Sequence, residues 1–151
     1  MKHDPFNVRL YRTRSERRLT MTEVHAMTGI APRMQNLYES GAHIPGVPAL
    51  TKIAICMDVS VDYLLGLTDD RRRHGRHEAA GSVGERLKTA RGTLNLSQDS
   101  LAQLLRTSRS RVAKWEAGQY PGFWSLAEIA AKCKVSADWL VGLSDNMEPV
   151  A

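Results

Sequence analysis

The sequence contains few cysteines and no long apolar run. Only two of its 151 residues are cysteines, Cys56 and Cys133, which is too few for the disulfide framework of a small secreted domain. Both lie in apolar segments, and we interpret them as buried free thiols. No run approaches the roughly 18 apolar residues that span a bilayer, and the N-terminal residues MKHDPFNVRLYR lack the apolar centre of a secretory signal. We therefore expect a cytoplasmic protein of bacterial or phage type, with no membrane partner.

Signatures of catalysis and of bound cofactors are also missing. There is no glycine-rich loop that would cradle a phosphate, and no Ser or Cys nucleophile accompanied by a base and an orienting group. His25 and His43 are isolated, and the His74-x-x-His77 pair has no cysteine or carboxylate at ligand spacing. The sequence therefore predicts a protein that is not an enzyme and that holds no metal and no cofactor.

The charge balance points to an anionic partner. The formal net charge is +5 and the isoelectric point is near 9.5, whereas the hydrophobic fraction of 42% and the charged fraction of 25% are ordinary for a globular protein. Positive charge favours nucleic acid or an anionic membrane surface. Because other basic proteins bind neither, the charge alone does not choose between them.

The chain repeats itself. The segment IAPRMQNLYESG, residues 30–41, has the same length and the same aromatic-Glu-x-Gly ending as TSRSRVAKWEAG, residues 107–118. Further matches at a shift of 77 pair Arg9, Leu10, Arg14 and Leu19 with Arg86, Leu87, Arg91 and Leu96. At a shift of 76, Leu50, Ile53, Val59, Ser60 and Asp62 pair with Leu126, Ile129, Val135, Ser136 and Asp138. We infer a tandem duplication, with a first domain at 1–69, a linker at 70–83 and a second domain at 84–151.

The linker sequence DRRRHGRHEAAGS has no large apolar residue, so we expect it to be flexible. Its arginines are Arg71, Arg72, Arg73 and Arg76. They can form an arm that contacts DNA phosphates or enters a minor groove. They can equally be the solubilising charges of a solvated hinge, and the sequence leaves both interpretations open.

Each copy has the pattern of five short helices, and no segment alternates as a strand does, so we expect an all-α fold. In the second copy Ser97, Ser108 and Ser136 are predicted N-caps, and Ser125-x-x-Glu128 is a predicted capping box. The apolar residues predicted to face inward in the helix after Ser97 are Leu101, Leu104 and Leu105. We also expect the three tryptophans to lie in the core.

The segment SQDSLAQLLRTSRSRVAKWEAG resembles the DNA-binding core of the Cro and lambda-repressor-like (XRE-type) helix-turn-helix family. The segments VSVDYLLGLTD and VSADWLVGLSD are similar to the fifth helix of that family. The resemblance covers residues 7–69 and 84–145. It implies two tandem five-helix domains, each with a recognition helix that enters the major groove of double-stranded DNA.

The second copy keeps the DNA-contacting residues that this resemblance implies. Arg109 and Ser110 stand at the tip of the recognition helix, and Lys114 lies about 140° around the helix from Arg109 and about 40° from Ser110. These three match the family's base readers. Gln98 matches its phosphate-bracing glutamine, Ser108 caps the helix, and Arg111 is expected to contact phosphate.

The first copy departs from this pattern. Met21 replaces the glutamine, and Pro32 and Leu37 stand in place of Arg109 and Lys114, so neither can donate to a base edge. Gln35 occupies the core slot of Val112, which should loosen or shift that helix. Arg33 and Asn36 remain as candidate DNA contacts.

The second copy has one irregularity of its own. Arg106 stands where the first copy has the turn residue Gly29, and a positive φ there would cost about 1 kcal/mol.

These patterns predict a sequence-specific DNA-binding transcriptional regulator, a repressor of phage or mobile-element type. The linker is long enough to place both domains on neighbouring half-sites about 34 Å apart, and it equally allows the first domain to form a homodimer. The alternative is a protein-binding adaptor, an antirepressor, antiactivator or antitoxin-like protein, in which the apolar recognition-like helix of the first domain docks a protein partner.

Overall fold

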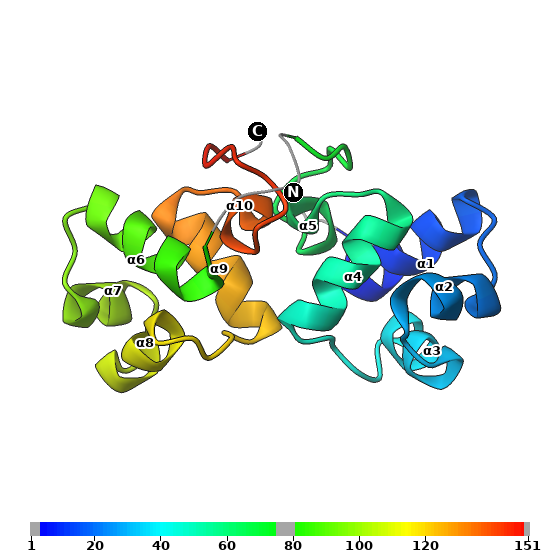
Figure 1. The fold of residues 1–151 in the computed structure, drawn as a ribbon, viewed down its shortest axis with the longest axis horizontal. Helices are drawn as coiled ribbons and strands as arrows, with labels where there is room; N and C mark the ends of the chain where they lie inside the picture. Colours follow the sequence, from blue (N-terminus) through cyan, green and yellow to red (C-terminus); the bar gives the residue numbers. More distant parts are fainter. Residues whose placement is uncertain (1–3, 75–80, 150–151) are drawn as a thin grey trace. The chain divides into compact units, whose positions relative to one another are not determined.

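The structure is a computed structural model that describes residues 4–74 and 81–149. These residues form α-helices and no β-strand, which confirms the all-α prediction (Figure 1). The helices are α1 (Phe6–Glu16), α2 (Met21–Thr28), α3 (Pro32–Ser40), α4 (Val47–Met57), α5 (Val61–Leu64), α6 (Val83–Thr93), α7 (Gln98–Leu104), α8 (Arg109–Glu116), α9 (Phe123–Cys133) and α10 (Ala137–Leu140). Within the described chain, no helix has the length and apolar character needed to cross a membrane.

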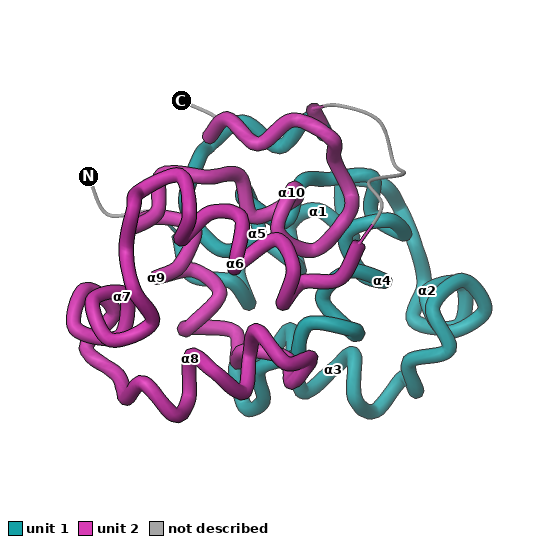
Figure 2. The backbone as a smooth tube through the Cα atoms, turned by 60° about the vertical axis from the view of Figure 1, so that its left-hand side comes forward, with its two compact units in different colours: residues 1–73 teal, residues 74–151 magenta. Residues whose placement is uncertain are grey.

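The chain divides into two compact units, residues 1–73 and residues 74–151 (Figure 2). Unit 1 contains α1 to α5, and unit 2 contains α6 to α10. Each unit has its own apolar core. In unit 1 the core includes Leu10, Val24, Leu50, Ile53 and Leu64, and in unit 2 it includes Leu87, Leu101, Val112, Leu126 and Ile129, all without solvent exposure. Burial of these side chains holds the short helices of each unit together.

Serine side chains cap the helices of unit 2 where the sequence predicts them. The side chains of Ser97, Ser108 and Ser136 accept hydrogen bonds from the backbone amides at the third position of α7, α8 and α10. The predicted capping box at Ser125 and Glu128 is wrong, because α9 begins three residues earlier, with Gly122 as its N-cap. The earlier start buries Phe123, which is only 5% exposed.

Two apolar side chains predicted to lie inside unit 2 are instead exposed. Leu104, at the end of α7, is 39% exposed, and Trp124, in the first turn of α9, is 62% exposed. The other two tryptophans, Trp115 and Trp139, are buried as predicted. Leu104 is the last residue of α7, whose buried residues are Leu101 and Ala102, and Trp124 is the second residue of α9, next to the buried Phe123.

The helices of the two units end in the same backbone conformations. Residues with positive φ close α1 at Arg18 (54°) and α6 at Asn95 (55°), and likewise α4 at Asp58 (51°) and α9 at Lys134 (56°). Gly29 follows α2 at 75°, and Arg106 follows α7 at 54°. The positive φ expected at Arg106 is therefore present, on a residue with a large side chain.

The segment predicted as the start of the linker lies against unit 1. The backbone amide of Ser60 donates to the carbonyl of Arg71 at 3.0 Å, and the first unit extends to Arg73. At the other end, Ser82 caps α6. The central part of the linker, residues 75–80, lies outside the described residues.

The two cysteines are buried free thiols, as predicted. Burial raises the pKa of both thiols above their ordinary value. This keeps them protonated and poorly nucleophilic near neutral pH.

Candidate nucleic-acid interface

The helix pair α7 and α8 contains residues of unit 2 that the sequence predicts to contact DNA. The two helices are joined by the short turn of residues 105–108 and pack against each other. Val112 is fully buried on the inner face of α8 and Trp115 is 5% exposed. Because these two residues fix which face of α8 points inward, Arg109, Ser110, Arg111 and Lys114 are turned to solvent.

An ion pair holds the C-terminal end of α8 on α6. The Arg91 guanidinium donates to both carboxylate oxygens of Glu116, at 3.0 and 2.9 Å, and also donates to the carbonyl of Leu96 at 2.9 Å. Both side chains are largely buried, and the hydrogen bond to Glu116 raises the pKa of Arg91. The same arrangement exists in unit 1 between Arg14 and Glu39. A two-pronged contact of this kind fixes the orientation of a helix end.

A glycine allows α6 to approach α8 closely. A Cβ atom on Gly84 would lie 2.6 Å from the carbonyl oxygen of Trp115 and 2.7 Å from that of Glu116. Any larger residue here would push the end of α8 away from α6. The position and angle of α8 therefore depend on contacts made by α6.

The outer face of α8 carries hydrogen-bond donors that the protein itself does not use. Arg109, Ser110, Arg111 and Lys114 are exposed. Within the described chain, the side chains of these four residues form no hydrogen bond or ion pair, although the Arg111 amide donates to the Ser108 cap. Unpaired cationic side chains on a rigid helix are available to phosphates and base edges without the loss of an internal bond.

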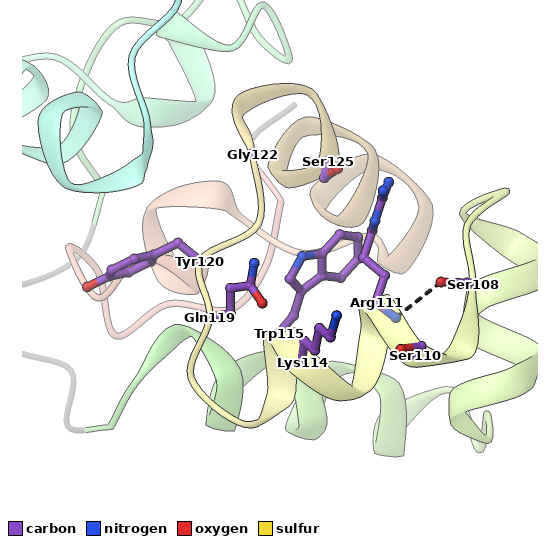
Figure 3. A pocket seen from close by; sticks show the side chains of 9 residues that line it. All are labelled: Ser108, Ser110, Arg111, Lys114, Trp115, Gln119, Tyr120, Gly122 and Ser125. Atoms are coloured by element: carbon purple, nitrogen blue, oxygen red, sulfur yellow. Dashed lines mark hydrogen bonds between the residues drawn. The ribbon is translucent and has the colours of Figure 1, made fainter.

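The structure brings four of the predicted residues together around an open polar pocket of about 500 Å³ (Figure 3). Ser108, Ser110, Arg111 and Lys114 line it from α8 and its cap. In Figure 3 the Arg111 side chain extends from α8 towards the start of α9, where Ser125 lies. The pocket is a depression with two cations on one wall, suited to an anionic group.

Two predicted residues of unit 2 lie outside this pocket. Arg109 stands at the first position of α8, exposed, and Gln98 stands half-buried at the first position of α7. Five lining residues were not predicted as site residues: Trp115 in α8, Gln119, Tyr120 and Gly122 in the loop after it, and Ser125 in α9. The one sequence signal for Tyr120 was its position, as an aromatic residue in a loop directly after the recognition-like helix.

The corresponding helix of unit 1, α3, presents a different surface. Arg33 and Asn36 are exposed, as a DNA contact requires, together with Pro32. Gln35 is fully buried, and its amide nitrogen donates to Glu39 at 2.8 Å, whereas its oxygen has no partner among the described residues. The polar residue in the core slot is thus accommodated by the Arg14–Glu39 pair.

The arginines of the predicted linker already have contacts in unit 1 where the structure describes them. The Arg71 guanidinium forms an ion pair with Glu16 and lies 5.7 Å from the centre of the Tyr63 ring. Arg72 pairs with Asp70 at 2.9 Å. Arg73 lies in the same segment, and Arg76 falls outside the described residues. Arg71 would have to leave Glu16 before it could contact a phosphate.

The chain is similar to known helix-turn-helix proteins. A family model described as a helix-turn-helix domain matches residues 84–145. A curated protein of Bacillus subtilis (strain 168), an uncharacterized HTH-type transcriptional regulator called YobD, is 42% identical over 62 residues. That match covers 41% of this chain and 55% of the relative, so the chain spans about half the length of the curated relative it matches. No solved structure matches. Both matches support a helix-turn-helix relationship, which the family model places at residues 84–145.

Proposed function

We propose that the protein is a sequence-specific, double-stranded-DNA-binding transcriptional regulator, a repressor of phage or mobile-element type. The observation that carries this proposal is the outer face of α8, where Arg109, Arg111 and Lys114 are exposed and unpaired on a helix anchored at its far end. The helix-turn-helix match at residues 84–145 and the name of the relative support DNA-binding regulation.

Recognition combines two kinds of contact. Arg109 and Ser110 at the tip of α8, with Lys114 one turn further, read base edges in the major groove. Arg111 and the polar pocket beside it take a backbone phosphate, and Gln98 at the start of α7 contacts another. The phosphate contacts release counterions, so affinity falls steeply as salt is added.

The chain acts as a tandem pair of helix-turn-helix domains in this proposal. In support, helices of both units end at positive-φ residues 76 or 77 positions apart, and the Arg14–Glu39 and Arg91–Glu116 pairs make the same contacts. In this proposal unit 2 recognises the DNA base sequence. Unit 1 contributes Arg33 and Asn36 on α3 and adds mainly non-specific affinity, either on a neighbouring half-site or as half of a homodimer. No enzymatic activity is part of this function.

The alternative, an adaptor that docks a protein on α3, has less support. The exposed residues of α3 are Pro32, Arg33, Asn36 and Ser40, whereas Met34 and Leu37 are partly covered. This surface is mixed rather than an apolar ridge, and such ridges carry helix-in-groove contacts.

The test is fluorescence anisotropy of the full chain on DNA from upstream of its own coding region, against a shuffled duplex of equal composition. We expect tighter binding to the upstream duplex at every salt concentration. Arg111→Ala should weaken binding to both duplexes and lower the salt slope by about 1. Equal affinity for the two duplexes, with a slope unchanged by Arg111→Ala, would contradict the proposal.

A further inference from the structure

Unit 2 has a groove lined by the end of α7, the turn that follows it and α9. In unit 1, α2 packs on α4, and the Cys56 sulfur lies 3.7 Å from the Met27 sulfur. In unit 2, two depressions of about 160 and 440 Å³ lie beside α7 and α9, and they share Leu105, Arg106 and Glu128 in their walls. Because of these shared walls we treat them as one feature, the α7–α9 groove.

The groove has exposed apolar side chains at both ends. Trp124 lines one depression and is 62% exposed, and Leu104 lines the other and is 39% exposed. Trp115 forms part of the wall beside Trp124. A large exposed tryptophan next to a depression is typical of an anchor point in a protein interface, and a phosphate backbone would gain nothing from it.

The charges around the groove are mainly positive. Arg106, Arg111 and Lys132 line the two depressions, and Glu128 is their one carboxylate. None of the three cations has a side-chain hydrogen bond or ion pair within the described residues. The surface therefore complements a ligand that presents apolar side chains flanked by carboxylates.

We propose that the α7–α9 groove binds an acidic amphipathic helix of a partner protein, with its apolar face on Trp124 and Leu104 and its carboxylates on Arg106, Arg111 and Lys132. Such helices dock in grooves between helices through side chains at i, i+4 and i+7. The open groove fits an extended ligand better than an enclosed small molecule, which needs most of its surface buried.

Arg111 links this groove to DNA binding. Its side chain lines both the polar pocket of the candidate nucleic-acid interface and the smaller depression of the groove. When Arg111 binds a carboxylate of the partner helix, it is no longer available to bind a DNA phosphate. The partner and DNA therefore compete for Arg111. This competition rests on the proposed function, whereas docking in the groove does not.

The docking step is tested with the full chain and a fluorescein-labelled helical peptide of about 15 residues, a length at which a designed helix begins to be stable. The peptide carries leucines at i, i+4 and i+7 flanked by glutamates, and a matched peptide carries lysines instead. We expect saturable binding of the acidic peptide only. Trp124→Ala and Lys132→Glu should each lower its affinity about tenfold, and Glu128→Gln should raise it.

Ile55→Ala, at a 51% exposed apolar position on α4, is the matched control and should leave peptide affinity unchanged. Thermal melting of each variant checks that it is folded. Equal binding of the two peptides, or acidic-peptide affinity unaffected by Trp124→Ala and Lys132→Glu in folded protein, would overturn the proposal.

Added upstream DNA should displace the peptide, and Trp124→Ala should leave DNA affinity unchanged. If DNA binds without displacing the peptide, the partner helix and DNA do not compete. If the chain binds the peptide as expected but shows no preference for its upstream DNA, the proposed function fails while docking stands.

Discussion

Arg106 is a residue of unit 2 with a long side chain in a backbone conformation that favours glycine. Its φ of 54° is left-handed, a conformation that costs a residue with a Cβ atom about 1–2 kcal/mol. Gly29, in the same place in unit 1, avoids that cost. The arginine is retained in the wall of the α7–α9 groove, which is consistent with a binding role for its side chain.

Replacing Arg106 with glycine should therefore stabilise the protein. We expect Arg106→Gly to raise the free energy of unfolding by about 0.5–1 kcal/mol, because relief of the strain exceeds the extra entropy of glycine in the unfolded chain. Gly29→Ala is the matched control: a Cβ there would meet no atom within 4 Å, and strain alone should lower stability by about 1 kcal/mol. Urea unfolding measures the stability of both variants. If Arg106→Gly is less stable than the wild type, the backbone at Arg106 is not strained.

A pKa measurement tests whether Arg71 rests on unit 1. The hydrogen bond from Arg71 lowers the pKa of the Glu16 carboxyl. The small contribution of this exposed pair to stability is therefore present above the unfolded pKa of about 4.3 and is lost as pH falls through the lower folded pKa. In Arg71→Gln we expect the pKa of Glu16 to rise towards its ordinary value in an NMR titration.

Arg72→Gln, which removes a guanidinium paired with Asp70 instead, should leave the Glu16 titration unchanged. If Glu16 titrates identically in wild type and Arg71→Gln, the segment does not lie where the structure places it. Arg71 would then be free to act as the phosphate-binding arm.

Among the elements, α8 owes its position to α6. Gly84 permits the close approach of α6 to α8, and Arg91 forms a two-pronged ion pair with Glu116 at the same end of α8. The donors on the outer face of α8 are thus presented on a helix whose C-terminal end is fixed. Precise base readout requires such rigid presentation.

Gly84→Ala should disturb this contact. We expect a loss of about 2 kcal/mol of stability from overpacking against the carbonyls of Trp115 and Glu116, together with weaker DNA binding. Gly92→Ala lies on the same helix, where a Cβ would meet no atom within 4 Å, and should stabilise by about 0.5–1 kcal/mol. Equal effects of the two substitutions in thermal unfolding would contradict the close approach of α6 to α8.

The parts of the structure that local rules govern were predictable from the sequence. The caps at Ser97, Ser108 and Ser136 depend on one side chain and an amide three residues away. The left-handed turn at Arg106 followed from comparison with Gly29. The predicted capping box at Ser125 is not formed, because α9 already begins at Phe123, whose side chain is buried, with Gly122 as N-cap.

The tertiary contacts of the candidate site were not predictable in the same way. Glu116 and Arg91 recur in the repeat, yet their pairing depends on how α6 crosses α8. Gln119 and Tyr120 line the polar pocket because of the path of a loop, and no local pattern encodes that path. The exposure of Trp124 likewise depends on where α9 begins.

In the whole molecule, the two units share internal contacts and differ in their exposed side chains. Both units keep the buried arginine–glutamate pair and the left-handed helix ends. Donors suited to base readout are concentrated on α8, whereas α3 has Pro32 and Leu37 in place of Arg109 and Lys114. Unit 2 should therefore determine which sequence is bound.

The most direct test is selection of binding sites from random DNA by the full chain and by its Arg109→Ala and Arg33→Ala variants. For Arg109→Ala we expect one base position to lose its preference and specific affinity to fall by about 1–3 kcal/mol. For Arg33→Ala we expect the same selected sequence, bound somewhat more weakly. Loss of the sequence preference in Arg33→Ala, with an unchanged preference and affinity in Arg109→Ala, would show that α8 does not read the DNA.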